Sequence, residues 1–390
     1  MKIGILHSGD LKNISPGGIS QYIEKMIENN NNYNEITVFG TCEYSEDYEL
    51  FKKYNKTING IPYIFIPVSK NNKRPLSIFY FFNIFKMYLK NKNLLEEIDV
   101  LFAQRMEYVL PFKFIFRKKK VIMAVHGSGK YAYIFWGKII GTVYNYIEKL
   151  SINRANRVIV LLNREEFGVP YYKNKFKKYK DKFIYGKVPI DTNLFKQLNK
   201  EEIRNKFKID NDDKVVLYCG RVENNPKRVL LFPEIAKELS KSITNLKWII
   251  VGNGSDIKVL KDVVKENKLD DVFIFKGHVK HGVDLVEMIN CADVSILLSS
   301  FEGICMSALE SISCGVPVVA TDVGDVNEYI KENCNGIIIP NNSQEQIVSN
   351  GIDKLKEVLL GETNIYINNV VENYRTDIVY SELIDILKDS

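Results

Sequence analysis

The chain has 390 residues, of which 45% are hydrophobic and 26% charged, and its formal net charge is +6. This is an ordinary soluble composition, and the length favours two domains. No apolar run approaches the ~20 residues of a membrane-spanning helix, which excludes such a helix. The six cysteines form no CxxC pair. We therefore expect reduced core cysteines in a cytoplasmic protein without a signal peptide.

Short apolar runs separated by polar segments predict parallel strands in the first half of the chain. We expect these strands at residues 2–6, 35–39, 61–66, 99–103, 121–125 and 157–162, while the pattern assigns nothing to 42–58. Gly17 and Gly18 precede a predicted helix at 21–28, and adjacent glycines let a backbone approach a bulky charged group, although a plain turn is the alternative. His126 ends its strand and is followed by glycine. It should therefore face a crevice rather than the core.

The same alternation continues in the second half. Strands are expected at 214–219, 246–251, 272–275, 293–298 and 316–320, with helices at 304–314 and 364–387. We place the domain boundary near residue 188, which gives domains over 1–188 and 189–370, with a C-terminal helix at about 371–390. Alternating strands and helices in both halves predict an α/β protein with two doubly wound, Rossmann-like sheets that face a central cleft.

Two cations follow the first strand of the second half. Arg221 and Lys227 lie in a loop that begins at Gly220. Such a pair suits a diphosphate leaving group, where it offsets the charge that develops on the departing oxygen. Two ordinary surface charges are the alternative.

Two carboxylates lie near the strand predicted at 293–298. Eight helical residues separate Glu302 from Glu310, a rise of ~12 Å, so the two cannot form one acid/base pair. We expect them to hold two ends of an elongated ligand. Between them, the backbone amides of Gly303, Ile304, Cys305 and Met306 should be unpaired at the positive end of a helix dipole, where phosphate binds.

Three segments are rich in aromatic residues. Segments 113–120 and 173–182 are also basic, whereas 76–90 carries too few charges for an ordinary exposed helix. Two interpretations are equally compatible with these segments. They are either core helices with solvated ends, or parts of a surface that lies on an anionic membrane leaflet. No recognition motif for nucleic acid accompanies them, so no nucleic acid partner is expected. His278 and His281 lack the further ligands of a metal site, and we expect no metal.

Several motifs together carry a family resemblance. Glu302 and Glu310, followed by the segments 315–321 (GVPVVAT) and 324–328 (GDVNE), resemble the donor-site signature of retaining glycosyltransferases of the family-4 type, which have the GT-B fold. The resemblance covers nearly the whole chain and is weakest between residues 42 and 118. It departs from the family where Val188-Pro-Ile190 replaces an Asn-Gly pair, and where Arg228 replaces the glycine after Lys227.

The resemblance implies roles for these residues. Arg221 and Lys227 would stabilise the leaving diphosphate, Glu302 would hold sugar hydroxyls, and Glu310 would hold the ribose. His126 would contact the sugar, and Gly17 and Gly18 would close over the diphosphate. The backbone around His278 and Val279 would hold the nucleobase.

The function that follows is a retaining, metal-independent transfer from a nucleoside diphosphate sugar. We expect a hexosyl or N-acetylhexosaminyl unit, UDP as the nucleotide and no other cofactor. The acceptor would be a hydroxyl of a glycan or lipid-linked acceptor in bacterial surface polysaccharide biosynthesis, with the enzyme at the inner face of the cell membrane. Another GT-B enzyme, such as an epimerase or a sugar-phosphate synthase, and a non-catalytic nucleotide-binding scaffold are the alternatives.

Overall fold

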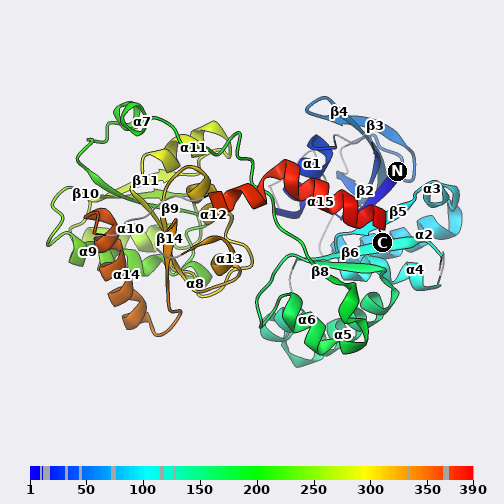
Figure 1. The fold of residues 1–390 in the computed structure, drawn as a ribbon. Coiled ribbons are helices and arrows are strands. Elements are labelled where there is room, and N and C mark those ends of the chain that lie inside the picture. Colours follow the sequence, from blue (N-terminus) through cyan, green and yellow to red (C-terminus); the bar gives the residue numbers. More distant parts are fainter. Residues whose placement is uncertain are drawn as a thin grey trace. The chain divides into compact units, whose positions relative to one another are not determined.

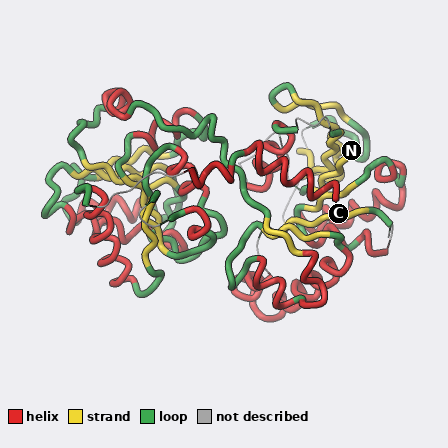
Figure 2. The backbone as a smooth tube through the Cα atoms, viewed as in Figure 1, coloured by secondary structure: helices red, strands yellow, loops and turns green. Residues whose placement is uncertain are grey.

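The computed structural model describes residues 1–8, 11, 18–30, 34–43, 46–71, 76–114, 118–126, 129–331, 334–362 and 369–389. The chain divides into two compact units. Unit 1 comprises Met1–Pro189 with Thr376–Ser390, and unit 2 comprises Ile190–Arg375. Strands and helices alternate along the chain in both units (Figures 1 and 2).

Unit 1 is built on a sheet whose strand order is β3-β4-β2-β1-β5-β6-β7-β8. The strands are β1 (Lys2–Leu6), β2 (Glu35–Glu43), β3 (Tyr54–Ile58), β4 (Ile61–Asn71), β5 (Val100–Ala103), β6 (Lys120–Val125), β7 (Arg157–Val160) and β8 (Phe183–Tyr185). All neighbours pair in parallel except β3, which is antiparallel to β4. The segment 42–58, which the sequence pattern left unassigned, thus holds the end of β2 and the edge strand β3.

A short turn explains that hairpin. Asn59 and Gly60 join β3 to β4 with φ values of 48° and 83°. Both central residues therefore lie in the left-handed region, as in the two-residue turns that match the twist of a hairpin, and Asn-Gly is the preferred pair there. The Asn-Gly signal was present in the sequence.

The helices of unit 1 cover the two faces of this sheet. They are α1 (Gly18–Glu28), α2 (Leu76–Lys90), α3 (Asn93–Glu96), η1 (Met106–Val109), α4 (Pro111–Phe114), α5 (Gly129–Arg154), α6 (Val169–Lys175), η2 (Lys177–Lys182) and α15 (Thr376–Asp389). The connections from β4 to β5 and from β6 to β7 run in the same direction along the sheet. Because such crossovers are right-handed, α2 and α5 cover the same face. Residues of both helices accordingly belong to one apolar cluster.

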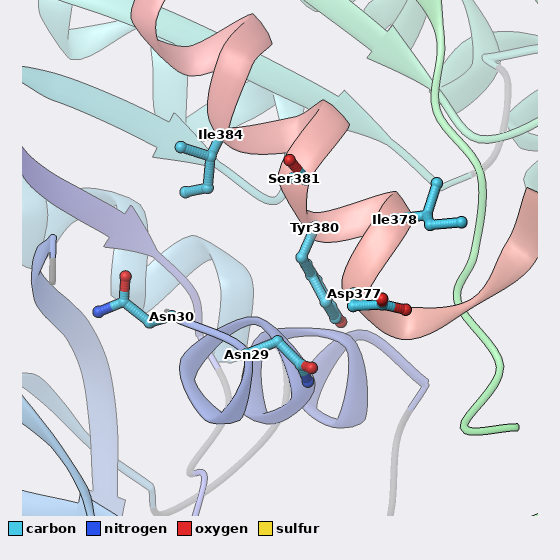
Figure 3. Close-up of a pocket in the computed structure, with 7 residues that line it drawn as sticks. All are labelled: Asn29, Asn30, Asp377, Ile378, Tyr380, Ser381 and Ile384. Carbon is cyan, nitrogen blue, oxygen red and sulfur yellow. The ribbon is translucent and has the colours of Figure 1, made fainter. Parts of the chain in front are cut away.

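Helix α15 returns to unit 1 and packs on α1. The buried Tyr380 donates a hydrogen bond to the carbonyl of Tyr22 at 2.5 Å, and Lys187 Nζ pairs with Glu382 at 3.0 Å. A pocket of about 350 Å³ lies beside this contact, lined by Asn29, Asn30, Asp377, Ile378, Tyr380, Ser381 and Ile384 (Figure 3). Asn29 and Asn30 follow α1 and precede β2, so the pocket lies at the amino ends of the strands. Ligands of doubly wound sheets bind at the opposite edge.

Unit 2 has a fully parallel sheet in the order β11-β10-β9-β12-β13-β14. Its strands are β9 (Lys214–Cys219), β10 (Leu246–Val251), β11 (Phe273–Gly277), β12 (Val294–Leu297), β13 (Val318–Thr321) and β14 (Gly336–Ile339). Its helices are α7 (Lys200–Phe207), α8 (Asn224–Lys227), η3 (Val229–Leu231), α9 (Phe232–Leu239), α10 (Ile257–Glu266), α11 (Val283–Asn290), α12 (Met306–Ser313), α13 (Val326–Tyr329), α14 (Gln344–Leu359) and η4 (Asn369–Tyr374).

Local sequence fixes several helix ends in unit 2. The side chain of Asn199 accepts hydrogen bonds from the amides of Glu201 and Glu202 at the start of α7, and Ser343 caps α14 in the same way. These caps satisfy amides that a helix N-terminus leaves unpaired. The C-terminal helix α15 begins at Thr376. The sequence pattern predicted a helix from residue 364, and residues 363–368 lie outside the described part of the chain.

Candidate active site

The order of the strands places a candidate site in unit 2. The chain runs from β9 outward through β10 and β11, and then returns to β12 beside β9 and continues to β14. β9 and β12 therefore flank a topological switch point, where the loops after the strands diverge and leave a crevice at their carboxyl ends. The loops that follow β9 and β12 carry Lys227 and Glu302, respectively.

These loops bring Lys227 and Glu302 into an ion pair. Lys227 Nζ donates to Glu302 Oε1, and the hydroxyl of Ser299 donates to the same oxygen at 2.6 Å. The side chains of Lys227 and Glu302 are only 17% and 13% exposed. Little water competes with a pair at this depth, so its charges act more strongly on a neighbouring group than surface charges would. The pair joins a cation and an acid that are 75 residues apart in sequence.

Arg228 stands where the family that the sequence resembles has glycine, and it adopts a backbone conformation that favours glycine. Its φ of 53° is left-handed, a conformation that costs a residue with a Cβ about 1 kcal/mol. Its guanidinium donates to the carbonyls of Leu298 and Ser299 at 3.3 Å and to Asn341 Oδ1 at 2.7 Å. Burial lowers the pKa of this guanidinium from its ordinary value. The arginine thus ties the loop after β9 to the loop after β12.

Arg221 is placed differently from Lys227. Its side chain is 68% exposed, and its guanidinium pairs with Glu223 in the same loop at 3.0 Å. The hydroxyl of Tyr218 holds the backbone by donating to the carbonyl of Arg221 at 2.7 Å. The described structure therefore brings Lys227, but not Arg221, to Glu302.

The prediction of four unpaired amides before α12 is wrong for two of them. The amide of Cys305 donates to the hydroxyl of Tyr329 at 3.1 Å, and that of Met306 donates to the carbonyl of Ile304 at 3.1 Å. The helix begins at Met306 instead of residue 304, and the buried tyrosine satisfies an amide that would otherwise await a ligand. Within the described ranges, the amides of Gly303 and Ile304 have no hydrogen-bond partner.

Gly324 fixes the turn that carries Glu302. A Cβ at this position would lie 2.1 Å from the carbonyl oxygen of Gly303 and 2.9 Å from that of Glu302. Its φ of 53° is also left-handed. The amide of Asp325 donates to the carbonyl of Gly303 at 3.3 Å. Only glycine allows the loop after β13 to approach the turn this closely.

Glu310 has a partner that the sequence did not identify. His281 Nε2 lies 3.0 Å from Glu310 Oε1, and the His281 ring packs 5.2 Å from that of Phe195. Glu310 is buried, while the side chain of His281 is 49% exposed. His281 lies in the loop between β11 and α11, and Glu310 lies in α12. The two residues are 29 positions apart in the sequence, so no local pattern linked them.

The thiol of Cys219 is partly buried at the end of β9. Burial raises the pKa of Cys219, at the end of β9, to about 12; the charge of Glu310 raises it further and that of Lys227 lowers it. Both charged groups therefore act on one atom at the carboxyl end of β9. His278 and Val279 follow β11; His278 is exposed and Val279 packs partly against the core.

Unit 1 has a second polar cluster at its own switch point, between β1 and β5. Gln104, which follows β5, accepts a hydrogen bond from His126 Nε2 through Oε1 at 2.9 Å. His7, which follows β1, has its Nε2 2.9 Å from the hydroxyl of Ser20. Sequence reasoning found His126 but missed His7 and Gln104. Gly18 is the first residue of α1, and Gly17 lies outside the described residues.

Both histidines of this cluster are neutral at pH 7. Burial lowers the pKa of His126 to about 4 and that of His7 to about 3, and the charge of Arg105 adds to both shifts. The buried amide nitrogen of Gln104 has no hydrogen-bond partner in the described part of the chain. A cluster of neutral donors and acceptors suits hydroxyl groups better than an anion.

These pKa values predict a pH dependence of stability. Their folded-state values lie below the ordinary 6.5, so the unfolded chain binds more protons below about pH 6.5. The free energy of unfolding should fall as pH drops from about 6.5 towards 4, by ~1.4 kcal/mol per pH unit for each histidine, and these groups should leave it constant above that window. Urea unfolding at several pH values measures it. The variant His7→Gln should have a shallower slope than the native chain, and an equal slope would contradict the assignment.

The described ranges contain no group of three or more His, Cys, Asp or Glu side chains that could hold a metal ion. They also contain no helix with the length and apolarity needed to cross a bilayer.

Comparison with known proteins shows which family part of the chain resembles. Residues 199–364 match the family "Glycosyl transferases group 1". An uncharacterized glycosyltransferase of Methanocaldococcus jannaschii is 29% identical over 54% of this chain and 54% of its own length. The N-acetyl-alpha-D-glucosaminyl L-malate synthase of Bacillus anthracis is 23% identical over 51% and 53%. The chain thus spans about half the length of the curated relatives it matches.

Solved structures match over the full length. The lipopolysaccharide outer core galactosyltransferase WaaB has a TM-score of 0.70 at 17% identity, covering 100% of this chain and 99% of WaaB. The Anabaena protein HepE in complex with UDP-glucose has a TM-score of 0.66 at 16% identity, covering 100% of both chains. These matches confirm the predicted fold class of two parallel-sheet α/β domains. Residues 199–364 thus resemble the group 1 glycosyl transferases, and the fold of the chain is of the GT-B type.

Proposed function

We propose that the protein is a retaining glycosyltransferase that moves a hexosyl or N-acetylhexosaminyl unit from a nucleoside diphosphate sugar to a hydroxyl acceptor. The observation that carries this proposal is the shielded Lys227–Glu302 pair at the switch point of the family-matched unit. UDP is the proposed nucleotide, supported by HepE, which binds UDP-glucose. The acceptor is a glycan or lipid-linked hydroxyl in surface polysaccharide biosynthesis, supported by the likeness to WaaB.

Lys227 is the proposed electrostatic catalyst. Its ammonium would move from Glu302 to the diphosphate when the donor binds, and would offset the charge that grows on the leaving oxygen. Glu302 would then accept hydrogen bonds from sugar hydroxyls, with Ser299 keeping the carboxylate oriented. The amides of Gly303 and Ile304 would bind phosphate oxygens, and the exposed Arg221 would add a second positive charge. In this scheme the chain's own cations serve the leaving group and no metal is required.

Glu310 is assigned to the ribose of the donor, and His126 is assigned to a substrate hydroxyl. Glu310 would accept from the ribose hydroxyls, while the backbone at His278 and Val279 would hold the nucleobase. His126 donates through Nε2 to Gln104, which leaves Nδ1 as an acceptor for a substrate hydroxyl. A neutral imidazole can accept such a bond at pH 7, whereas a protonated one cannot.

Retention of the anomeric configuration rests on the resemblance of the donor motif to that of retaining transferases. Glu302 pairs with Lys227 and Glu310 with His281, and the proposal assigns both acids to donor hydroxyls rather than to a covalent double displacement. Departure of the diphosphate and attack of the acceptor on the same face needs no enzymic nucleophile.

The experiment is a turnover assay with a panel of UDP-, GDP- and ADP-sugars and hydroxyl acceptors, followed by NMR of the product anomer. We expect release of UDP from one donor and an α-linked product from an α-linked donor. A β-linked product would contradict retention. Conversion of the donor without transfer to any acceptor would instead indicate an epimerase or a hydrolase.

A further inference from the structure

Helix α2 exposes an apolar stripe to solvent. Phe82, Phe85 and Leu89 are 62%, 37% and 58% exposed. They recur at the three- and four-residue spacing that aligns side chains on one side of a helix. The opposite side of α2 is buried in the core of unit 1 through Tyr80, Ile84, Met87 and Tyr88. The helix therefore has two apolar sides, of which the fold covers one.

Helix α5 exposes a second stripe of the same kind. Ile139, Ile140, Val143 and Tyr146 are 83%, 53%, 56% and 64% exposed. They begin after Gly137, whose φ of 79° interrupts the helix. Seven of the ten large apolar side chains that the described chain exposes lie on α2 and α5. Scattered single residues would need no explanation, but a concentration on two helices does.

The charges beside these stripes have one sign. Lys86 and Lys90 on α2 and Lys138 and Lys149 on α5 are exposed. The sequence of α2 contains no Asp or Glu, and that of α5 contains only Glu148. Glu148 is fully buried, where Tyr172 and Lys175 each donate to it at 2.7 Å. The two helices thus present lysines and apolar side chains together, with no acidic side chain among them.

Further lysines border α5. Lys173, Lys177, Lys178 and Lys180 are exposed on α6 and η2. The bonds from Tyr172 and Lys175 to Glu148 hold α6 against α5, and Figure 1 shows the two helices side by side. Because α2 and α5 cover the same face of the sheet, all these groups belong to one side of unit 1.

We propose that this side of unit 1 docks on the surface of an anionic lipid bilayer. The docking surface comprises Phe82, Phe85, Leu89, Ile139, Ile140, Val143 and Tyr146, flanked by Lys86, Lys90, Lys138 and Lys149. Apolar side chains enter the boundary between headgroups and acyl chains, and lysines beside them attract anionic headgroups. An interface with a second copy of this chain would instead bring lysines against lysines, a repulsion that no exposed acid on these helices relieves.

The proposal deepens the proposed function, because a bilayer is where a lipid-linked acceptor would be presented. It does not depend on that function, since binding to vesicles needs neither donor nor acceptor. The docking surface includes no residue assigned to the donor or to catalysis, so its variants should retain turnover on a water-soluble acceptor.

Vesicle sedimentation tests the docking surface. The native chain should sediment with vesicles of equal parts phosphatidylglycerol and phosphatidylcholine, and at least ~10-fold less with pure phosphatidylcholine. The apolar variant Phe82→Gln/Leu89→Gln/Ile139→Gln/Val143→Gln should lose binding by ~10-fold or more. A charge variant, Lys86→Glu/Lys90→Glu, should lose binding to the anionic vesicles and become insensitive to their composition.

Matched controls come from unit 2. Val259 and Val283 are 45% and 63% exposed, so Val259→Gln/Val283→Gln removes exposed apolar side chains elsewhere and should leave vesicle binding unchanged. Circular dichroism confirms that each variant is folded. The proposal is overturned if the native chain ignores anionic vesicles, or if the apolar variant binds them as the native chain does. It is also overturned if the native chain is a dimer and the apolar variant is a monomer, since a second copy would then cover the docking surface.

Discussion

Replacement of Lys227 by alanine should lower turnover by about 10²–10³-fold, the loss typical when one preorganised charge donor is removed from a transition state. Donor affinity should change much less, because the cation does most of its work on charge that develops only as the leaving oxygen departs. Steady-state kinetics measures the change in kcat, and calorimetric titration with the donor measures affinity.

Loss of Lys227 also affects Glu302, its ion-pair partner, and a double variant of the pair provides a control. Without the lysine, Glu302 keeps only Ser299 at a site where its side chain is 13% exposed, and the fold should lose about 2 kcal/mol of unfolding free energy. The double variant Lys227→Met/Glu302→Gln removes both charges and should recover most of that stability without recovering turnover. The exposed pair of Lys206 and Glu287 provides a matched variant, Lys206→Ala, with native turnover. Native turnover in Lys227→Ala would remove the lysine from the mechanism.

Replacement of Gly324 by alanine should damage the site without touching a charged residue. The new Cβ would meet the carbonyl oxygen of Gly303 at 2.1 Å, so the turn that carries Glu302 must move by an ångström or so. Misplacement of this size costs about 10²-fold in turnover. The left-handed φ adds about 1 kcal/mol of destabilisation. Kinetics and urea unfolding measure the two effects.

A variant at Gly361 separates the effect of backbone strain from the effect of the steric clash at Gly324. It also has a left-handed φ, 71°, but a Cβ there would have nothing within 4 Å. Gly361→Ala should therefore show only the cost of about 1 kcal/mol and keep native turnover. Equal losses of turnover in the two variants would mean that the close approach of Gly324 to Gly303 does not position Glu302.

Most strands were predictable because apolar runs of the right length alternate with amphipathic helices, but β3, β8 and β14 were not predicted. Lys227 and Glu302 each follow a predicted strand, and the structure shows those strands adjacent at the switch point. Arg221 has the same sequence signal, yet it pairs with Glu223. Residue type and spacing do not encode the direction in which a long exposed side chain points.

The hydrogen-bond partners that could not be predicted are far apart in the sequence. His281 meets Glu310, and Tyr329 takes the amide of Cys305, only because tertiary packing brings α11 and α13 to α12. The prediction of an unpaired amide failed for Cys305 because of that tyrosine, which no rule for helix ends could anticipate. His7 follows a strand as His126 does, but its contact with Ser20 of α1 is tertiary, and residue type and spacing do not encode it.

The central claim is that the Lys227–Glu302 pair receives a nucleoside diphosphate sugar. Calorimetric titration of the native chain and of Lys227→Met/Glu302→Gln with a nucleotide-sugar panel tests it most directly. We predict that one nucleoside diphosphate sugar binds the native chain, and that the double variant binds it at least ~10-fold more weakly, a loss of about 1.4 kcal/mol. Equal affinities, or no binding of any nucleotide sugar to the folded native chain, would contradict the claim.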